Sequence, residues 1–350
     1  MTSSAPSPTL PPPDTHSPRT GSQVVLDALV TAGVEVVFGY PGGAIMPLYD
    51  ALLDSPLAHV LVRHEQCAFH AADGFARAGG KLGVCLATSG PGATNLVTGI
   101  YNAMMDSVPV LCLTGQVGTG LIGTDAFQEA DVLSMVAGIT KHARVVRHVD
   151  ELPAAVAEAI YLATTGRPGP VLLDLPKDVQ RATTTCRAPE RIRVRAYRPR
   201  PRLQPDQIRR AQELLRESRR PVCIIGGGCK LAGATEAFRT WCRQTQVPVV
   251  STSNGLGSAE PGYAGYLGML GMHGLPRANR TVDQADLVIA LGMRFDDRVT
   301  GAPDRFAVGA RIVHVDIDEA ELGKIIPVHA PIHADLRTAL DAWNDLLVEE

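Results

Sequence analysis

Apolar positions in the first half of the chain fall into short runs that alternate with amphipathic stretches. Apolar residues recur at helical spacing, which predicts helices over residues 21–32, 44–53, 64–78, 95–105 and 152–164. Buried-strand patterns lie between them, over residues 34–38, 60–62, 82–87, 108–114 and 171–175. Strands that alternate with helices of this length predict a parallel, doubly wound α/β sheet.

The same alternation starts afresh near Pro205. A helix is predicted over residues 206–216, and strands are predicted over 222–225, 247–250, 285–291 and 311–317. The pattern therefore predicts a second doubly wound α/β domain over residues 205–350.

Two stretches lack any apolar period. Residues 1–20 are rich in Pro, Ser and Thr, and we expect a disordered tail. An organelle transit peptide is the alternative, but Arg19 is the only basic residue and three consecutive prolines prevent an amphipathic helix. Residues 181–204 carry eight arginines among prolines. We interpret them as a solvated linker after a first domain over 21–180, because a nucleic-acid surface would carry interleaved aromatic residues.

Composition narrows the class of protein. The hydrophobic fraction is 45%, the charged fraction is 20% and the net charge is −3, so nothing points to nucleic acid or an anionic membrane. Seven cysteines occur without a CxxC pair, which favours reduced thiols. No apolar run approaches the roughly 20 residues that span a bilayer. We therefore expect a cytoplasmic protein without membrane or nucleic-acid partners.

Ligands of open α/β sheets bind where the strands end at their carboxyl termini. In the first domain that edge is predicted to consist of the turns at Tyr40-Pro41, His64-Glu65, Thr88–Gly92 and Thr114–Val117. Glu65 lies where a strand passes into a helix of small residues, so it is a candidate to share a proton with a ligand. The alternative is that Glu65 caps the first turn of its own helix.

The segment Leu121–Ala130 differs from the rest because polar residues gather around the single aromatic Phe127. It is either a loop over a site or a capped helix start, with Thr124 or Asp125 as the cap and Gln128 or Glu129 reaching back.

Two glycine-rich segments mark the second domain. Gly226–Gly228 is a weak nucleotide signal, because Leu231 stands where the dinucleotide fingerprint needs its third glycine. Leu267–Gly274 is either a place where a flat ligand passes over the backbone or an irregular loop.

Several chemistries lack their motifs. The chain has no GxxxxGK[ST] phosphate loop, no GxSxG elbow, no HExxH and no Cys/His cluster of zinc type. The sequence therefore gives no support to a hydrolase or a metal enzyme, and we predict no metal ligands in this chain.

A set of motifs resembles thiamine-diphosphate enzymes, and more narrowly the acetolactate synthase catalytic subunits. In the first domain these are GYPGGA at 39–44, HEQ at 64–66, TSGPGATN at 88–95, GTDAFQEA at 123–130, RPGP at 167–170 and DLPKD at 174–178. In the second they are LGMHG at 270–274, RFDDR at 294–298 and HVDID at 314–318. The resemblance covers nearly everything from Gly21 onward.

The resemblance assigns roles to individual residues. It implies that Glu65 hydrogen-bonds a ring nitrogen of the cofactor's aminopyrimidine, which favours the tautomer that removes the thiazolium C2 proton. The pyrimidine pocket would also contain Pro41, Gly42, Gly43, Thr88 and Asn95. Phe127, Gln128 and Lys177 would reach the reacting centre. A structural FAD would be held by Arg167, Gly226, His273, Arg294, Asp316 and Asp335.

The resemblance also implies an activity and partners. The family decarboxylates pyruvate and joins the product to pyruvate or 2-oxobutyrate, in homodimers or higher oligomers whose sites lie at subunit interfaces. A regulatory small subunit is a further implied partner. Cys67 departs from the family, which has Gly after HEQ, and a modest packing change is expected there.

The family's third domain binds Mg²⁺ and the cofactor's diphosphate, and no such segment occurs before Glu350. We expect a fragment, half of a split enzyme or a truncated paralogue. The rival functions are a sibling carboligase or decarboxylase and a catalytically silent FAD-binding subunit.

Overall fold

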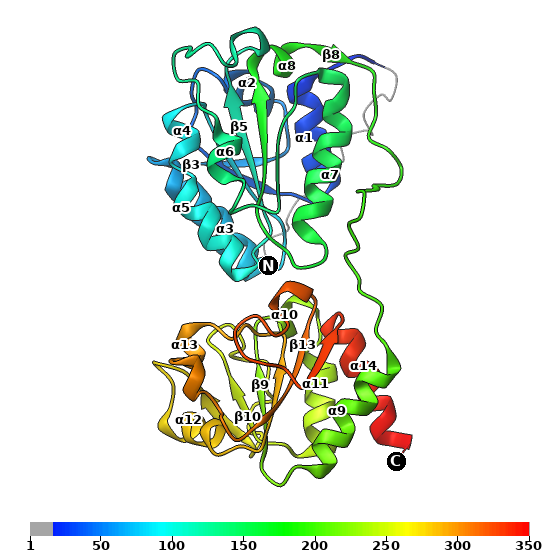
Figure 1. The fold of residues 1–350 in the computed structure, drawn as a ribbon. Helices are drawn as coiled ribbons and strands as arrows, with labels where there is room; N and C mark the ends of the chain where they lie inside the picture. The colour runs from blue at the N-terminus through cyan, green and yellow to red at the C-terminus, as the bar shows by residue number, and fades with distance from the viewer. Residues whose placement is uncertain (1–16, 350) are drawn as a thin grey trace, which may run out of the picture. The chain divides into compact units, whose positions relative to one another are not determined.

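The computed structural model describes residues 17–349 and divides into two compact units, Met1–Tyr197 and Arg198–Glu350 (Figure 1). Each unit contains a six-stranded sheet in which every neighbouring pair of strands is parallel. The prediction of two parallel α/β sheets is therefore confirmed.

The strand order of the first sheet is β3-β2-β4-β5-β7-β6. The strands are β2 (Val36–Gly39), β3 (Ala58–Leu61), β4 (Gly83–Ala87), β5 (Val110–Gln116), β6 (His142–Val145) and β7 (Val171–Pro176). Every residue of β4, β5 and β7 is buried, whereas β3 and β6 are partly exposed at the two edges. Continuous apolar runs suit the central strands because helices cover both of their faces.

The helices of the first unit form two layers (Figure 1). They are α1 (Gly21–Thr31), α2 (Met46–Leu52), α3 (Glu65–Gly79), α4 (Pro91–Thr94), α5 (Val97–Asp106), α6 (Val132–Val136), α7 (Leu152–Thr164) and α8 (Lys177–Arg181). One apolar core joins α1, α2 and α7 to one face of the sheet, and a second joins α3, α5 and α6 to the other.

Local signals explain where the helices begin and end. Thr20 and Gln23 form a capping box at the start of α1, and Gly33 (φ 77°) follows its end. The ring of His64 accepts a hydrogen bond from the Gln66 N–H and so caps α3, which ends at the left-handed Gly80.

The tail and the linker are shorter than predicted. Residues 1–16 of the predicted tail lie outside the described residues. Arg19–Thr20 forms strand β1, which pairs antiparallel with β8 (Thr183–Thr184), so the prediction of disorder is wrong for Arg19 and Thr20. The Tyr197 hydroxyl donates a 2.6 Å hydrogen bond to the Thr165 carbonyl, so part of the predicted linker packs on the first unit.

The second sheet has the order β11-β10-β9-β12-β13-β14. Its strands are β9 (Pro221–Ile225), β10 (Val249–Ser251), β11 (Tyr266–Met269), β12 (Leu287–Leu291), β13 (Arg311–Asp316) and β14 (Ala330–His333). Its helices are α9 (Pro205–Glu217), α10 (Gly228–Leu231), α11 (Thr235–Thr245), α12 (Pro276–Asp283), α13 (Asp297–Thr300) and α14 (Leu336–Glu349). Helices α9, α11 and α14 cover one face of the sheet, and α12 packs on the other.

All seven cysteines are free thiols, and five of them are buried. In the described part of the chain, no helix combines the length and apolar character that crossing a bilayer requires.

Candidate active site

The turns predicted to form a functional edge do lie along one edge of the first sheet. Strand ends stand in register there: Gly39 pairs with Leu61, and Gln116 pairs with Pro176. Since these strands are parallel, the turns that follow them share the carboxyl edge. That edge therefore carries the segments after β2, β3, β4, β5 and β7.

Glu65 is half-buried and is the first residue of α3. One of its carboxylate oxygens accepts a 2.9 Å hydrogen bond from the Asn95 side-chain amide, which comes from the turn after α4. The His64 ring is the cap of this helix, and Glu65 lies in its first turn, so the alternative of a role at the start of its own helix also agrees with the structure. The negative charge of Glu65 suits the first turn of a helix. Sequence-distant residues thus converge on the carboxyl group.

Glycines and Thr88 form a close-packed cradle beside Glu65. The Thr88 hydroxyl accepts a 3.3 Å hydrogen bond from the Ala44 N–H. A Cβ atom at Gly42 would lie 2.5 Å from the Thr88 Cβ, and one at Gly92 would lie 3.3 Å from a Glu65 carboxylate oxygen. A Cβ at Gly43 would meet nothing within 4 Å. The backbone thus leaves open space at Gly43, where a flat ring can lie against the main chain, so these residues fit an aminopyrimidine.

This cradle gives a paired prediction. Gly42→Ala is expected to lower the free energy of unfolding by about 1–3 kcal/mol, because the new methyl group would overlap Thr88. Gly43→Ala is the matched control and is expected to cost nothing in stability, because its methyl group enters open space. Urea denaturation of both variants tests this, and equal destabilisation would contradict the cradle.

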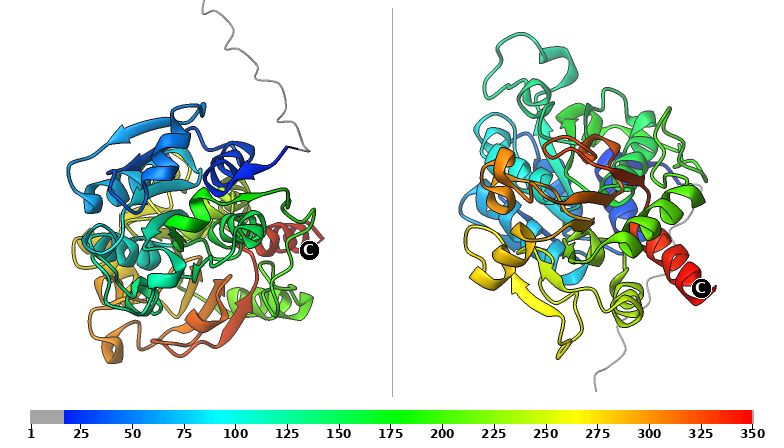
Figure 2. Two further views of the ribbon diagram at one scale, coloured as in Figure 1. Left: turned by 90° about the horizontal axis from the view of Figure 1, so that it is seen from above. Right: turned by 60° about the horizontal axis from the view of Figure 1, so that its bottom comes forward.

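The segment after β5 forms a loop that we call the site loop, residues 117–131. It projects from the first unit (Figure 2, right, teal). The Glu129 carboxylate closes it by accepting hydrogen bonds from the backbone N–H groups of Gly123, Thr124 and Ala126. These bonds, with that of Gly123 foremost, lower the pKa of Glu129.

The capped-helix interpretation of this segment is wrong. Asp125 and Gln128 both adopt positive φ (58°), and the next helix, α6, is capped by Asp131 instead. A loop over the edge of the sheet is the interpretation that agrees with the structure.

The site loop brings one predicted residue to the edge and turns another outward. A Cβ at Gly90 would lie 2.9 Å from the Gln128 Cα, so Gln128 rests directly on the turn that carries Thr88. The Phe127 side chain is 87% exposed. Lys177 is half-buried and begins α8 just beyond β7, at the same edge. Pro41 is exposed on the turn after β2.

Sequence reasoning missed the polar groups that hold the site loop to the sheet. Asp178 accepts hydrogen bonds from the N–H and hydroxyl of Thr119. Burial alone would raise the pKa of Asp178, but these bonds outweigh it and lower the pKa. Asp174 is 1% exposed and accepts from Thr114 (2.7 Å) and Gln116 (2.8 Å). A single acid inside the apolar run VLLDLP was the available signal.

The residues predicted to hold FAD divide between the units. In the second unit, Asp316 ends β13 and accepts a hydrogen bond from the Asp318 N–H (2.9 Å). Asp335 follows β14 and accepts from the Thr338 N–H in the first turn of α14 (3.1 Å). Arg294 is half-buried after β12, 4.0 Å from the Asp296 carboxylate.

Three other residues of this set have different surroundings. His273 is exposed. Gly226 follows β9 and packs on the backbone of Gly292, which leaves no room for a side chain. Arg167 lies in the first unit, where its Nε donates to the Ser107 hydroxyl (2.8 Å). Ser107 precedes β5 and Arg167 precedes β7, so this hydrogen bond lies at the amino edge of the first sheet, whereas Glu65 lies at the carboxyl edge.

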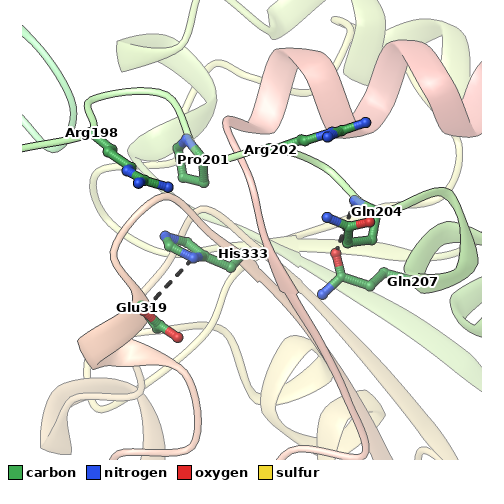
Figure 3. A pocket seen from close by; sticks show the side chains of 7 residues that line it. All are labelled: Arg198, Pro201, Arg202, Gln204, Gln207, Glu319 and His333. Atoms are coloured by element: carbon green, nitrogen blue, oxygen red, sulfur yellow. Dashed lines mark hydrogen bonds and ion pairs between the residues drawn. The ribbon is translucent and has the colours of Figure 1, made fainter.

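A pocket of about 400 Å³ lies in the second unit (Figure 3). It is lined by Arg198, Pro201, Arg202, Gln204, Gln207, Glu319 and His333. Figure 3 shows the Arg198 and His333 side chains facing the same space, and the His333 ring lies 4.0 Å from the Glu319 carboxylate. None of the residues predicted to hold FAD lines this pocket.

Among residues 17–349, no three His, Cys, Asp or Glu side chains gather as a metal-binding group.

Two family models match the chain, one for each unit. Residues 19–135 match the thiamine pyrophosphate enzyme N-terminal TPP binding domain, and residues 208–343 match the central domain of the same enzymes. The chain therefore belongs to the thiamine pyrophosphate enzyme family.

Within that family the chain is similar to acetolactate synthase large subunits. It is 49% identical to the isozyme 2 large subunit of Escherichia coli K12. The alignment spans 327 residues, which are 93% of this chain and 59% of that subunit. It is also 49% identical to the large subunit of Corynebacterium glutamicum, over 322 residues that are 92% of this chain and 51% of that subunit. The Lactococcus lactis large subunit is 48% identical over 329 residues, with 93% and 57% covered. The chain thus spans somewhat more than half the length of these relatives.

Proposed function

We propose that this chain supplies the pyrimidine-binding and central domains of an acetolactate synthase large subunit. The proposed reaction decarboxylates pyruvate and joins the remaining two-carbon unit to a second 2-oxo acid, which gives 2-acetolactate or 2-aceto-2-hydroxybutyrate. The observation that carries the proposal is the Glu65 carboxylate, held by Asn95 beside the glycine cradle at the carboxyl edge of the sheet. Identity of 49% to acetolactate synthase large subunits supports the reaction type.

Thiamine diphosphate, when bound, supplies the carbanion chemistry of the reaction. The chain's own residues bind and orient it. The Glu65 carboxyl would hold and exchange a proton at a ring nitrogen of the cofactor, and the Asn95 amide fixes the direction of that carboxyl. Gly42, Gly43 and Thr88 give the ring a flat surface, and Pro41 flanks them.

The site loop would complete the reacting centre. Gln128 rests on the turn at Gly90, beside the cradle, so its side chain can orient a substrate carbonyl or carboxylate. Phe127 would exclude water when a substrate or a second subunit covers it, because its ring is otherwise exposed. The Lys177 ammonium at the same edge would attract an anionic 2-oxo acid.

In the central domain, FAD is the proposed second cofactor, with a structural role. Asp316 and Asp335 lie at the carboxyl ends of β13 and β14, where doubly wound folds hold the ribose of a dinucleotide. Arg294, His273 and Gly226 would complete the set in this unit. Mg²⁺ would be bound by a segment that the longer relatives have beyond the matched part. A homodimer and a regulatory small subunit are the proposed partners.

The test of the proposed function is a fusion protein. Residues 1–350 are joined to the part of the E. coli isozyme 2 large subunit that follows its matched segment. With thiamine diphosphate, Mg²⁺ and FAD, the fusion is expected to form acetolactate from pyruvate, and 2-aceto-2-hydroxybutyrate when 2-oxobutyrate is added. A folded, FAD-bound fusion that releases acetaldehyde or acetate instead would assign a sibling decarboxylase or oxidase.

The 350-residue chain itself should behave differently. We expect the purified chain to bind FAD, to bind thiamine diphosphate weakly and to form no acetolactate. The Glu65 site would hold the pyrimidine alone, whereas the diphosphate contributes much of the charge that holds such a cofactor. Flavin absorbance after gel filtration, a calorimetric titration with thiamine diphosphate and a colorimetric acetolactate assay measure the three outcomes, and robust turnover would contradict this prediction.

A further inference from the structure

Hydrogen bonds cross-link the site loop internally, and polar contacts attach it to the sheet at its beginning and its end. The hydrogen bonds of the Glu129 carboxylate join backbone groups within the loop. Attachment at the beginning of the loop comes from Asp178, which accepts from Thr119. At the end of the loop, the Gln116 Nε2 donates a 3.0 Å hydrogen bond to the Ala130 carbonyl. A unit of this kind moves as one piece when either attachment is lost.

Gln116 has every feature of a fixed anchor. It is 3% exposed and ends β5 in register with Pro176. Its Nε2 donates both to Ala130 and to the Asp174 carboxylate (2.8 Å), and its Oε1 accepts from the Val117 N–H (2.8 Å). Both amide hydrogens and the carbonyl are thus satisfied, so a flipped amide would leave buried groups unpaired.

Asp174 determines which way that amide points. An ionised carboxylate only accepts hydrogen bonds, so the Gln116 side that faces it must be the NH₂ group. The second hydrogen of the same NH₂ group then points at Ala130. The other Asp174 oxygen accepts from the Thr114 hydroxyl, which is buried in β5.

We propose that Gln116 is a positioning residue for the reaction. Through the Ala130 carbonyl it fixes the end of the site loop, and thereby sets where Phe127 and Gln128 lie relative to Glu65. This inference rests on the proposed function, because the two loop residues gain their catalytic importance from it. The hydrogen bonds of the Gln116 side chain go to Ala130, Asp174 and Val117 rather than to the cofactor cradle.

The matched pair of variants is Gln116→Met and Thr114→Val. Both remove a hydrogen bond to Asp174, but only Gln116→Met also releases Ala130 and removes the acceptor of the Val117 N–H, so both ends of the site loop lose a bond. In the 350-residue chain, chymotrypsin cleavage after the exposed Phe127 reports on loop mobility. Gln116→Met is expected to raise that cleavage about ten-fold, the effect of losing one or two buried hydrogen bonds, and to raise amide exchange at residues 123–126. Thr114→Val should stay within about two-fold of wild type.

In the fusion protein, kcat and the affinity for thiamine diphosphate are measured separately, because a role in stability alone would not lower kcat while leaving that affinity unchanged. Gln116→Met is expected to lower kcat about ten-fold while the affinity for thiamine diphosphate stays within about two-fold, because the cradle is untouched. Thr114→Val should keep its kcat. If Gln116→Met does not fold, Gln116→Asn serves instead, since it keeps the amide but withdraws it from Ala130 by one methylene.

If Gln116→Met kept the cleavage rate and the kcat of wild type, the proposal would be overturned. Equal changes in Thr114→Val and Gln116→Met would overturn it as well. An inactive wild-type fusion would contradict the proposed function alone, because the cleavage comparison needs neither cofactor nor substrate. The two failures are therefore distinguishable.

Discussion

Replacing Glu65 with glutamine is expected to lower kcat for acetolactate formation in the fusion protein by about 10²–10³-fold. Glutamine has the same shape, and its carbonyl can still accept the hydrogen bond that the Asn95 amide donates to Glu65. The cradle around Gly42 and Thr88 would therefore keep its form. What the variant lacks is an exchangeable carboxyl proton at the position that faces the cofactor ring.

Stability measurements separate this effect from a role in helix α3. A negative charge in the first turn is worth about 0.3–1 kcal/mol, so Glu65→Gln should change the free energy of unfolding by no more than that. Glu35→Gln is the control acid, because Glu35 is exposed and pairs with Lys81 at 2.6 Å, away from the cradle. Retention of kcat within about three-fold in Glu65→Gln would remove Glu65 from the chemistry.

Long apolar segments made much of the fold predictable. The helix predicted over residues 152–164 has those bounds in α7, and β7 extends the predicted strand by one residue. The buried sides of these elements are dictated by many apolar residues at once, so one atypical residue does not change the pattern. The carboxyl edge followed from the same alternation of strands and helices, since parallel strands place their final turns together.

Short and half-buried elements were not predicted from the sequence. The strands β6, β11 and β14 have four residues each, and each is partly exposed or interrupted by polar residues, so no apolar run marks them. The pairing of β1 with β8 joins residues 19–20 to residues 183–184, and no local pattern reveals such a distant partner. Backbone hydrogen bonds between distant segments decide these elements.

The site was predictable as a set of turns but not as a set of contacts. Glu65 and Asn95 are 30 positions apart, and their hydrogen bond depends on how α3 packs against α4 and α5. The helix-cap interpretation of Leu121–Ala130 failed because the local sequence does not reveal the positive φ of Asp125 and Gln128. The link from Gln116 to Asp174 crosses 58 positions and two neighbouring strands.

Asp174 also gives the second large expected effect, on how stability depends on pH. Burial raises the pKa of Asp174 to about 6 from its ordinary 3.8, against the opposing hydrogen bonds from Thr114 and Gln116. The folded protein therefore holds this proton more tightly than the unfolded chain does. The resulting stabilisation is fully present below about pH 4 and is lost as pH rises through about 6. A shift of about two units corresponds to a free energy on the order of 3 kcal/mol.

Asp174→Asn should abolish this pH dependence. The asparagine carbonyl can accept from Gln116 while its amide donates to the Thr114 hydroxyl, so the anchor of the site loop would persist. Relative to the variant, wild type is expected to lose about 1.4 kcal/mol of stability between pH 5 and pH 8. Native-state hydrogen exchange of the β5 amides, corrected for intrinsic rates, measures the opening free energy of the first unit.

Asp150→Asn provides the control of opposite sign in the same unit. The Thr184 hydroxyl donates to the exposed Asp150 carboxylate and lowers its pKa. Its contribution is therefore complete above about pH 4 and is lost only below that. Because the His148 ring lies 3.5 Å from this carboxylate, the control is made in a His148→Asn background, where the difference between the two proteins should stay flat between pH 5 and pH 8. A flat difference for Asp174→Asn as well would mean that Asp174 is ionised in both states over this range. Gln116 would then face a fixed charge, and the burial of that carboxyl would have no consequence for proton binding.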